Sequence, residues 1–455
     1  MPTTTEAPVG YARRVGLFSG VMMVIGGIIG SGIFRNPQVV AARVHTPGLT
    51  LGAWIIGGVV ALIGAFVYGE LGARFPRAGG GYVYIRDAYG TLPAFLYAWG
   101  LLLMVATGAI AAVAVTFANY FIALTGLAVS PNLLAGAAIV LLSAVNYVGV
   151  RPGAITQNLF TVLKLLALAV VIGAGIAFAA HWLPASPPPP DTTQAPKPIA
   201  LALAAALVPV LFSYGGWQQT NYIAEEIIDP VRNLPRALVI GVIGVIVVYL
   251  FANYTYLATL GAAGLAASDA PAADAMGHLL GPAGRTFITV GIVVSTFGFL
   301  NLVILVSPRV YQAMAADGLF FPQLARLHPR FRTPTAAIIV QCAWAILLLG
   351  LGTYGALLDY VVFADWITFA ATASTLFVYR ARERRGDLSA GSATFRTFGY
   401  PWAPLLFIAA GVYVVIGSIV SNPGNALKGT ALLLAGVPVY LFWKNRTARA
   451  AGGLR

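Results

Sequence analysis

Charged residues are scarce in this sequence. Only 9% of its 455 residues are Asp, Glu, Lys or Arg, 59% are hydrophobic, and the mean hydropathy is +0.84. None of the four charged types occurs between Asp87 and Arg151. A soluble globular domain carries about 25% charged residues, so this composition excludes that class. The uncharged stretch has room for two membrane-spanning helices, since each needs roughly 20 apolar residues.

Cysteine is nearly absent as well. Cys342 is the single one, which excludes an intramolecular disulfide. The opening MPTTTEAPVGYARR contains an acid and lacks a short apolar stretch followed by a small-residue cleavage site. It therefore does not match a cleavable signal peptide, and we expect the first apolar run to be retained in the protein.

Catalytic and metal-binding patterns are missing. The apolar runs contain no HExxH, no Walker-type glycine loop and no plausible Ser/His/Asp set, which argues against an enzyme. The histidines fall in expected loops or at the ends of runs and have no metal-ligand spacing. They are His45, His181, His278 and His328. The sequence predicts neither a metal site nor a cofactor.

Long apolar runs dominate the chain instead. About twelve are long enough to cross a membrane. They lie near 16–43, 48–74, 93–124, 132–150, 155–181, 199–227, 237–260, 284–308, 334–352, 355–379, 401–420 and 428–444. This pattern predicts an all-α membrane protein with about twelve transmembrane helices, and an even number places both termini on one side of the membrane.

The basic residues separate these runs. The chain has 27 Lys and Arg residues against 14 acids, a net charge of +13, but no basic domain or stripe that would indicate a nucleic-acid partner. Two basic residues, Arg35 and Lys164, lie within runs. Only four fall on the face opposite the termini: Arg43, Lys197, Arg285 and Lys428. Because cytoplasmic loops carry the excess of Lys and Arg, both termini are predicted to be cytoplasmic.

Two glycine-rich interruptions break the apolar pattern. Residues 26–34 read GGIIGSGIF within the first run, and residues 212–217 read FSYGGW within the sixth. A backbone break at membrane depth is costly unless its N–H and C=O groups are satisfied. Glycines also serve close helix packing, so either cluster alone is ambiguous. Paired breaks in corresponding runs of two halves, each with a polar residue, are typical of an inverted-repeat transporter.

The chemistry of such breaks suggests a ligand. The N-terminus of a half-helix presents free N–H groups and the positive end of the helix dipole, which suit a carboxylate. The C-terminus of a half-helix presents free carbonyls, which suit an ammonium group. Two breaks side by side can therefore hold the α-carboxylate and the α-amine of an amino acid.

Several segments together resemble the amino acid–polyamine–organocation superfamily, and within it the L-type amino acid transporters and their bacterial relatives. The resemblance covers the first ten runs. The segments are GGIIGSGIF from Gly26, YGELGARFPRAGGGYVYI from Tyr68, TVLKLLALAVVI from Thr161, FSYGGW from Phe212, EEIIDPVRNLPRAL from Glu225, and STFGFLN followed by SPRVYQAMAADG in the eighth run.

The resemblance implies a fold of the leucine-transporter type. This fold consists of two five-helix inverted repeats and two additional peripheral helices. The first and the sixth helix are discontinuous. The chain then divides into a cytoplasmic tail (1–15), the first repeat (16–181), a proline-rich outside loop (182–198), the second repeat (199–379), a cytoplasmic loop (380–400), the peripheral helices (401–444) and a cytoplasmic tail (445–455).

The resemblance also implies which residues contact a substrate. Three residues of the first break would hold the carboxylate: Gly30, Ser31 and Gly32. The carbonyls of Ile28 and Phe212 would hold the amine, and the Phe212 ring is similar to the family's aromatic gate. In the second break, Ser213 adjoins the same site and Gly215 adjoins the pocket for the substrate side chain.

Lys164 places an ammonium group inside the fifth run, where an unpaired charge costs several kcal/mol. Because it lies about ten residues from the cytoplasmic end, snorkelling to the interface is one interpretation. The resemblance implies another. Lys164 would then be a tethered cation that replaces a sodium ion, bonds carbonyls near the first break and couples occupancy to gating.

Other polar residues in the runs leave further choices open. Glu70, Glu225 and Glu226 lie near run ends and are expected to pair with nearby arginines. Asp365 lies deeper in the tenth run, and an acid at that depth can relay protons. Gln218 faces either the pocket or a neighbouring helix.

The sequence thus predicts a secondary transporter of amino acids that works by alternating access. No acid is firmly placed in the pocket for a cationic side chain, and no pocket arginine is evident for an anionic one. Small-to-medium neutral L-amino acids are the predicted substrates, moved by sodium-independent exchange. Proton-coupled symport, or a polyamine or other amine substrate, is the alternative.

Partners and location follow from the same features. The outside loop at 125–133 has no cysteine, so no disulfide-linked heavy chain is expected. This suits a stand-alone bacterial carrier in the inner cell membrane, whose partners are the amino acid and the lipid bilayer. Nothing in the sequence sets the oligomeric state.

Overall fold

The computed structural model describes residues 10–183, 198–351, 354–391, 393–421 and 423–452. Within these residues the regular structure is helical, and the one strand-like contact is an isolated parallel bridge between Val15 and Ile227. The all-α prediction is therefore confirmed. Most of the expected proline-rich loop at 182–198 and the outer parts of both tails lie outside the described residues.

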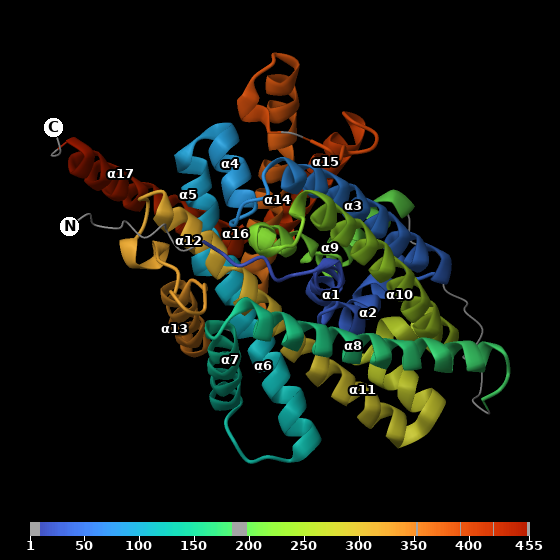
Figure 1. Ribbon diagram of the computed structural model, residues 1–455. Helices are drawn as coiled ribbons and strands as arrows, with labels where there is room; N and C mark the ends of the chain where they lie inside the picture. The colour runs from blue at the N-terminus through green and yellow to red at the C-terminus, as the bar shows by residue number, and fades with distance from the viewer. Residues whose placement is uncertain (1–9, 184–197, 352–353, 392, 422, 453–455) are drawn as a thin grey trace.

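Helices follow one another along nearly the whole described chain (Figure 1). In the first half they are α1 (Leu17–Ile28), α2 (Gly32–Val44), α3 (Pro47–Arg74), α4 (Gly81–Tyr89), α5 (Thr91–Gly100), the π-helical η1 (Leu101–Val105), α6 (Ala106–Thr125), α7 (Pro131–Tyr147) and α8 (Val150–Ala179). In the second half they are α9 (Ile199–Ser213), the 3-10 helix η2 (Trp217–Glu226), α10 (Pro230–Ala267), α11 (Pro271–Val306), α12 (Pro308–Ala316), the 3-10 helix η3 (Pro322–Ala325), α13 (Thr335–Leu351), α14 (Tyr354–Arg384), the 3-10 helix η4 (Leu388–Ala390), α15 (Trp402–Ser421), α16 (Pro423–Leu434) and α17 (Gly436–Gly452).

Some of these helices are long and apolar enough to span a membrane. In the described chain, eight helical segments are long and apolar enough to cross a membrane, and α1 with α2 makes a ninth that is bent by 43° at its break. The helices α7 and α13 are apolar but only 17 residues long. Each predicted run overlaps one helix or a series of consecutive helical segments, as with α5, η1 and α6 over 93–124. The multi-span architecture is thus present, while the number twelve stays a prediction.

The two predicted breaks are real interruptions that touch one another. The first separates α1 from α2 at residues 29–31, and the second separates α9 from η2 at residues 214–216, where Gly216 has a φ of 105°. A Cβ on Gly216 would lie 2.2 Å from the carbonyl oxygen of Gly27. Only glycine fits at such a contact between two backbones.

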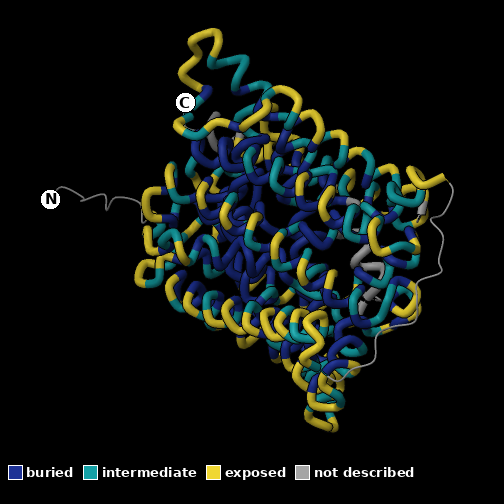
Figure 2. Tube along the Cα trace, turned by 90° about the vertical axis from the view of Figure 1, so that its right-hand side faces the viewer, coloured by how far each residue is buried: buried dark blue, intermediate teal, exposed yellow. Residues whose placement is uncertain are grey.

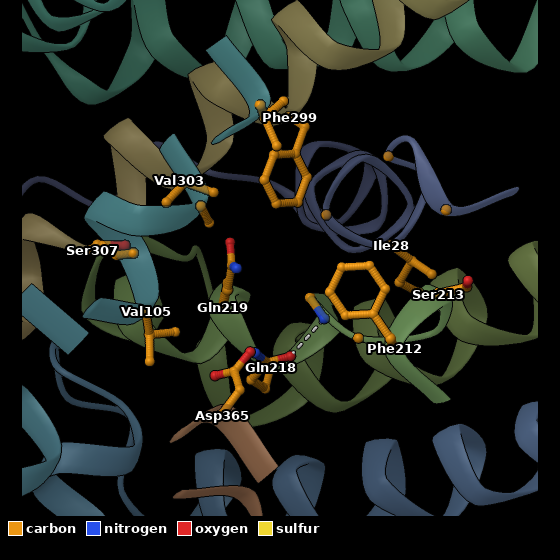
Figure 3. Close-up of a pocket in the computed structure, with 18 of the residues that line it drawn as sticks. Ile28, Val105, Phe212, Ser213, Gln218, Gln219, Phe299, Val303, Ser307 and Asp365 are labelled. Carbon is orange, nitrogen blue, oxygen red and sulfur yellow. Dashed lines mark hydrogen bonds between the residues drawn. The ribbon is translucent and has the colours of Figure 1, made fainter. Parts of the chain in front are cut away.

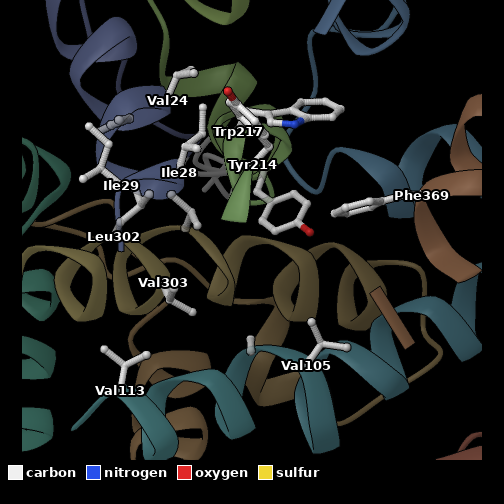
Figure 4. Packing of buried hydrophobic residues seen from close by; sticks show 14 of the residues in the cluster. Val24, Ile28, Ile29, Val105, Val113, Tyr214, Trp217, Leu302, Val303 and Phe369 are labelled. Atoms are coloured by element: carbon white, nitrogen blue, oxygen red, sulfur yellow. The ribbon is translucent and has the colours of Figure 1, made fainter. Parts of the chain in front are cut away.

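Helices from the two halves of the chain interleave around these breaks. The long α10 packs against α1, α2, α3 and α8, and α11 packs against α6 and α8. Figure 4 shows Ile28 at the end of α1 and Ile29 of the first break facing Leu302 of α11, with Trp217 and Tyr214 on the side of the second break. Buried positions fill the centre of the bundle in Figure 2, and exposed ones lie along its outer helices.

Buried ion pairs join the helix ends near the bridge between Val15 and Ile227. Glu226 at the end of η2 pairs with Arg309 of α12 at 2.7 Å, and neither side chain is exposed. Glu70 of α3 pairs with Arg74 at 2.8 Å and with Arg380 of α14 at 2.6 Å.

The acids expected to pair with arginines thus do so in two of three cases, although Arg309 and Arg380 are distant in sequence. Glu225 instead accepts the backbone N–H of Ala78. These contacts tie the second half of the chain to the first at one end of the bundle, which we call the ion-pair end.

Removing one member of the buried pair should destabilise the protein. Arg309→Met leaves the Glu226 carboxylate buried without a partner, which costs about 3–5 kcal/mol. Thermal unfolding of the detergent-purified protein should show a clearly lower midpoint, and Glu226→Gln added to Arg309→Met should restore much of it.

The matched control is Arg285→Met, which breaks the pair with Asp274. The Arg285 side chain is 61% exposed, so this change should cost no more than about 1 kcal/mol. An equal loss of stability in both single variants would contradict the assignment.

Candidate substrate-binding site

A small cavity lies where the two breaks meet. Its volume is about 90 Å³, enough for several water molecules or a small solute. The lining comes from the α1–α2 break, the α9–η2 break, η1, α6, α11 and α14. Figure 3 shows the rings of Phe212 and Phe299 at this site, with the side chain of Gln219 to the left of both rings and pointing towards Val303.

The first break presents free backbone donors to this cavity. The N–H of Gly30 bonds the carbonyl of Ile28 at 2.9 Å. By contrast, the N–H groups of Ser31, Gly32 and Ile33 donate to no acceptor within the described chain. They lie at the N-terminus of α2, where the helix dipole is positive. Such an array is a ready anion site, and a carboxylate fits it.

The second break presents carbonyls. The carbonyl of Phe212 accepts only the N–H of Gly215, at 3.1 Å, and therefore keeps a free lone pair in the described structure. The carbonyl of Ile28 is more fully engaged, because it accepts both the N–H of Gly30 and the hydroxyl of Tyr249 at 2.9 Å. Of the two expected amine contacts, Phe212 is thus the one open to a ligand.

Two side chains hold the breaks against each other. Tyr249 of α10 places its hydroxyl 2.9 Å from the carbonyl of Ile28 and 3.2 Å from that of Ser213. Asn36 of α2 donates to the Ser213 hydroxyl at 2.7 Å and to the Pro209 carbonyl at 3.1 Å. The Ser213 hydroxyl in turn donates to Pro209, so it positions the break, and a substrate would have to compete for it.

Lys164 lies in the interior of the bundle and is fully buried, not at the interface. Its Nζ donates to the carbonyls of Gly26 at 3.1 Å, Ile29 at 2.7 Å and Ser295 at 3.3 Å. All three N–H donors of the ammonium group thus have acceptors. The Ile29 carbonyl belongs to the first break and the Gly26 carbonyl to the last turn of α1, so Lys164 bonds the chain at and directly before the break.

The two neighbouring glutamines complete the polar lining. Gln218 faces the cavity, and its Oε1 accepts the N–H of Gly216 at 2.9 Å, which caps the second break (Figure 3). Its Nε2 and the Oε1 of Gln219 are buried without a partner in the described structure. Gln219 was not among the predicted site residues, and nothing in its sequence context distinguishes it.

Asp365 is the one lining residue that carries a carboxyl group. No Lys, Arg or His lines the cavity, and among the described residues Asp365 has no ion pair. Tyr68, Tyr97 and Tyr222 lie close enough to interact with it electrostatically. The sequence placed no acid firmly in the pocket and left the role of Asp365 open. In the structure α14 presents the Asp365 side chain to the cavity (Figure 3).

A second cavity adjoins the first at Ser31. It is lined by Arg35 of α2, Asn119 and Tyr120 of α6, and Asp269 in the turn after α10. These elements lie at the end of the bundle opposite the ion-pair end. In the part of the chain that the structure describes, no cluster of three or more His, Cys, Asp or Glu is placed to hold a metal ion.

Fold and site together define a class: a multi-pass membrane protein with a ligand cavity at two broken helices. The sequence profile of the family described as amino acid permease matches residues 15–442. The chain belongs to this family. It therefore belongs with transporters and not with enzymes, which confirms both the predicted resemblance and the prediction that it is no enzyme.

Individual relatives agree along nearly the full chain. It is 32% identical to the mouse large neutral amino acids transporter small subunit 2 over 450 residues, covering 96% of this chain and 83% of the relative. It is 31% identical to the human Asc-type amino acid transporter 1, covering 96% and 84%. It is 30% identical to the mouse b(0,+)-type amino acid transporter 1, covering 96% and 90%.

The hydrogen bonds of Lys164 lead to a direct test. Lys164→Met should lower uptake about tenfold or more while the protein still folds, because buried carbonyls of the first break lose a donor worth 1–3 kcal/mol each. Uptake into proteoliposomes and the thermal midpoint are measured together. Lys428→Met, an exposed lysine of α16, is the control and should transport normally. Normal uptake by Lys164→Met would refute this role.

Proposed function

We propose that this protein is a secondary transporter that exchanges amino acids across the cell membrane by alternating access. Membership of the amino acid permease family supports amino acid transport. The finer terms, which are sodium-independent antiport and small-to-medium neutral L-amino acids as substrates, are our proposal. Its strongest support is the cavity with free N–H groups on one side and a free carbonyl on the other.

A zwitterion fits that arrangement of the two breaks. The α-carboxylate would lie against the N–H groups of Ser31 and Gly32, beside Gly30, and the α-amine against the carbonyl of Phe212. Phe212 and Gly215 would flank the side chain of the substrate. Backbone groups recognise what all amino acids share, so specificity must come from the remaining lining residues.

Sodium independence rests on Lys164. Its ammonium group donates to three carbonyls beside the first break, which is the environment that a bound cation would need. A resident positive charge leaves no need for a sodium ion there. We infer that Lys164 couples the state of the site to movement of α1.

The membrane arrangement follows the same reasoning. We propose twelve spans in two five-helix inverted repeats, 16–181 and 199–379, followed by the peripheral pair 401–444, with both termini in the cytoplasm of a bacterial cell. The ion-pair end is then cytoplasmic. Cys342 lies in α13 and the loop at 125–133 has no cysteine, so no disulfide-linked heavy chain is expected.

Asp365 favours a second candidate. A carboxylate in a largely apolar cavity without a facing cation is costly unless it binds a proton or a cation. The residue would therefore serve either as the proton carrier of a symporter or as the partner of a second amine on the substrate, in a cationic amino acid or a polyamine.

Uptake of labelled amino acids into proteoliposomes separates these functions. Neutral, cationic and anionic amino acids and a diamine are tested, with and without internal amino acid, sodium and a pH gradient. If the protein is an exchanger, uptake of neutral amino acids should require internal amino acid and should be the same with or without sodium and a pH gradient. If no amino acid is bound or moved, the proposal fails.

Asp365→Asn gives the decisive variant, because an amide has nearly the shape of the carboxyl group but carries no charge. If the exchanger takes neutral substrates, this variant should keep neutral uptake within about twofold, since no charged contact to the substrate is lost. A loss of about tenfold or more restricted to cationic substrates, or a loss of drive by the pH gradient, would support the second candidate instead. Asp387→Asn in an exposed turn is the matched control.

A further inference from the structure

A third cavity, outside the substrate site, is lined by arginines. Its volume is about 480 Å³. Four arginines from three segments surround it, and we call it the arginine pocket: Arg14 before α1, Arg151 in α8, and Arg330 and Arg332 in the loop between η3 and α13. Loops that are far apart in sequence meet here, since the Thr333 hydroxyl bonds the Tyr147 carbonyl at 2.9 Å.

The charge of this pocket is uncompensated. No acid is among its lining residues, and within the described chain none of the four arginines forms an ion pair. Arg330 lies over the ring of Phe331 at 5.6 Å, which leaves its charge available. Gathering four like charges raises the local potential, and an anion at the centre would lower it.

The backbone adds to the same field. Helix α8 begins at Val150, directly after Gly149, and both Val150 and Arg151 line the pocket. Their N–H groups are at the positive end of a 30-residue helix. A helix N-terminus beside converging arginines is the usual chemistry for a phosphate.

An exposed apolar face continues from the pocket along α8. Ile155 and Leu159 follow Arg151 at intervals of four residues, so they share its face of the helix. Ile155 is 58% exposed, Leu159 55% and Leu166 57%. On a membrane-spanning helix these side chains face lipid. The headgroup chemistry and the acyl-chain surface are therefore contiguous.

We propose that the arginine pocket binds the phosphate of an anionic phospholipid, whose acyl chains lie along the exposed face of α8. With the ion-pair end in the cytoplasm, this lipid belongs to the inner leaflet, where basic clusters beside membrane helices attract anionic headgroups. The site is independent of the substrate cavity and makes no use of its residues.

Such a lipid would also fasten the segment before α1. The N–H groups of Arg14 and Val15 both donate to the carbonyl of Glu226, at 2.9 and 3.0 Å, so this segment covers the end of η2. A phosphate shared by Arg14, Arg151 and the 330–332 loop would hold that segment in place. The bound lipid thus favours the conformation in which the ion-pair end is closed.

Ligand-induced stabilisation of the full-length protein in detergent tests the site. The probes are dioctanoyl phosphatidylglycerol, dioctanoyl phosphatidylcholine, glycerol 3-phosphate and inorganic phosphate at equal concentration. Phosphatidylglycerol should raise the thermal midpoint, and the other three should leave it nearly unchanged. Equal stabilisation by inorganic phosphate or glycerol 3-phosphate would overturn the lipid assignment in favour of a free-anion site, and equal stabilisation by phosphatidylcholine would overturn the charge argument.

The variant Arg151→Gln with Arg330→Gln should weaken phosphatidylglycerol binding roughly tenfold, through two lost contacts to the anionic headgroup. Both residues are exposed, so the midpoint without lipid should match that of the unmodified protein, which verifies folding. The matched control is Arg384→Gln with Arg385→Gln; these exposed residues are the last of α14 and the one that follows it. An unchanged lipid response in the first variant, or an equal loss in the control, would refute the proposal.

Discussion

The structure depends on one constraint: backbone groups at a helix break inside a membrane must find partners within the protein. Lys164, Gln218 and Tyr249 supply those partners at the two breaks. Among the described residues, the N–H groups of Ser31, Gly32 and Ile33 at the start of α2 have no acceptor, and the carbonyl of Phe212 keeps a free lone pair. These backbone groups face the cavity, where a bound ligand can supply their hydrogen-bond partners.

The two ends of the bundle are built differently. At the ion-pair end, Glu226 with Arg309 joins two segments of the second half, and Glu70 with Arg380 joins the first half to the second, both in buried contacts. At the other end a second cavity reaches Ser31, and Arg35 and Asp269 on its walls are exposed. In the described conformation, ion pairs close the ion-pair end of the bundle, and the opposite end is more open because it contains the second cavity.

Sequence reasoning located the features that depend on local pattern. The glycine clusters predicted both breaks, and the isolated ammonium of Lys164 pointed to an interior role. The sequence pattern does not determine contacts that depend on how each helix is rotated about its axis. Asp365 and Gln219 enter the cavity because of the rotation of α14 and the tight turn at Gly216, and Glu226 meets an arginine 83 positions away. The number of spans and the substrate's side chain likewise depend on information beyond local pattern.

The contact between Gly27 and Gly216 has a mechanical consequence. With 2.2 Å between the Gly27 oxygen and the position a Cβ would take on Gly216, the two broken helices leave no slack at their crossing point. Neither can tilt without displacing the other, so they form a single pivot. A molecule that binds at α2 and shifts the α1–α2 helix therefore also shifts the α9–η2 helix. The walls that the two helices contribute to the cavity move together.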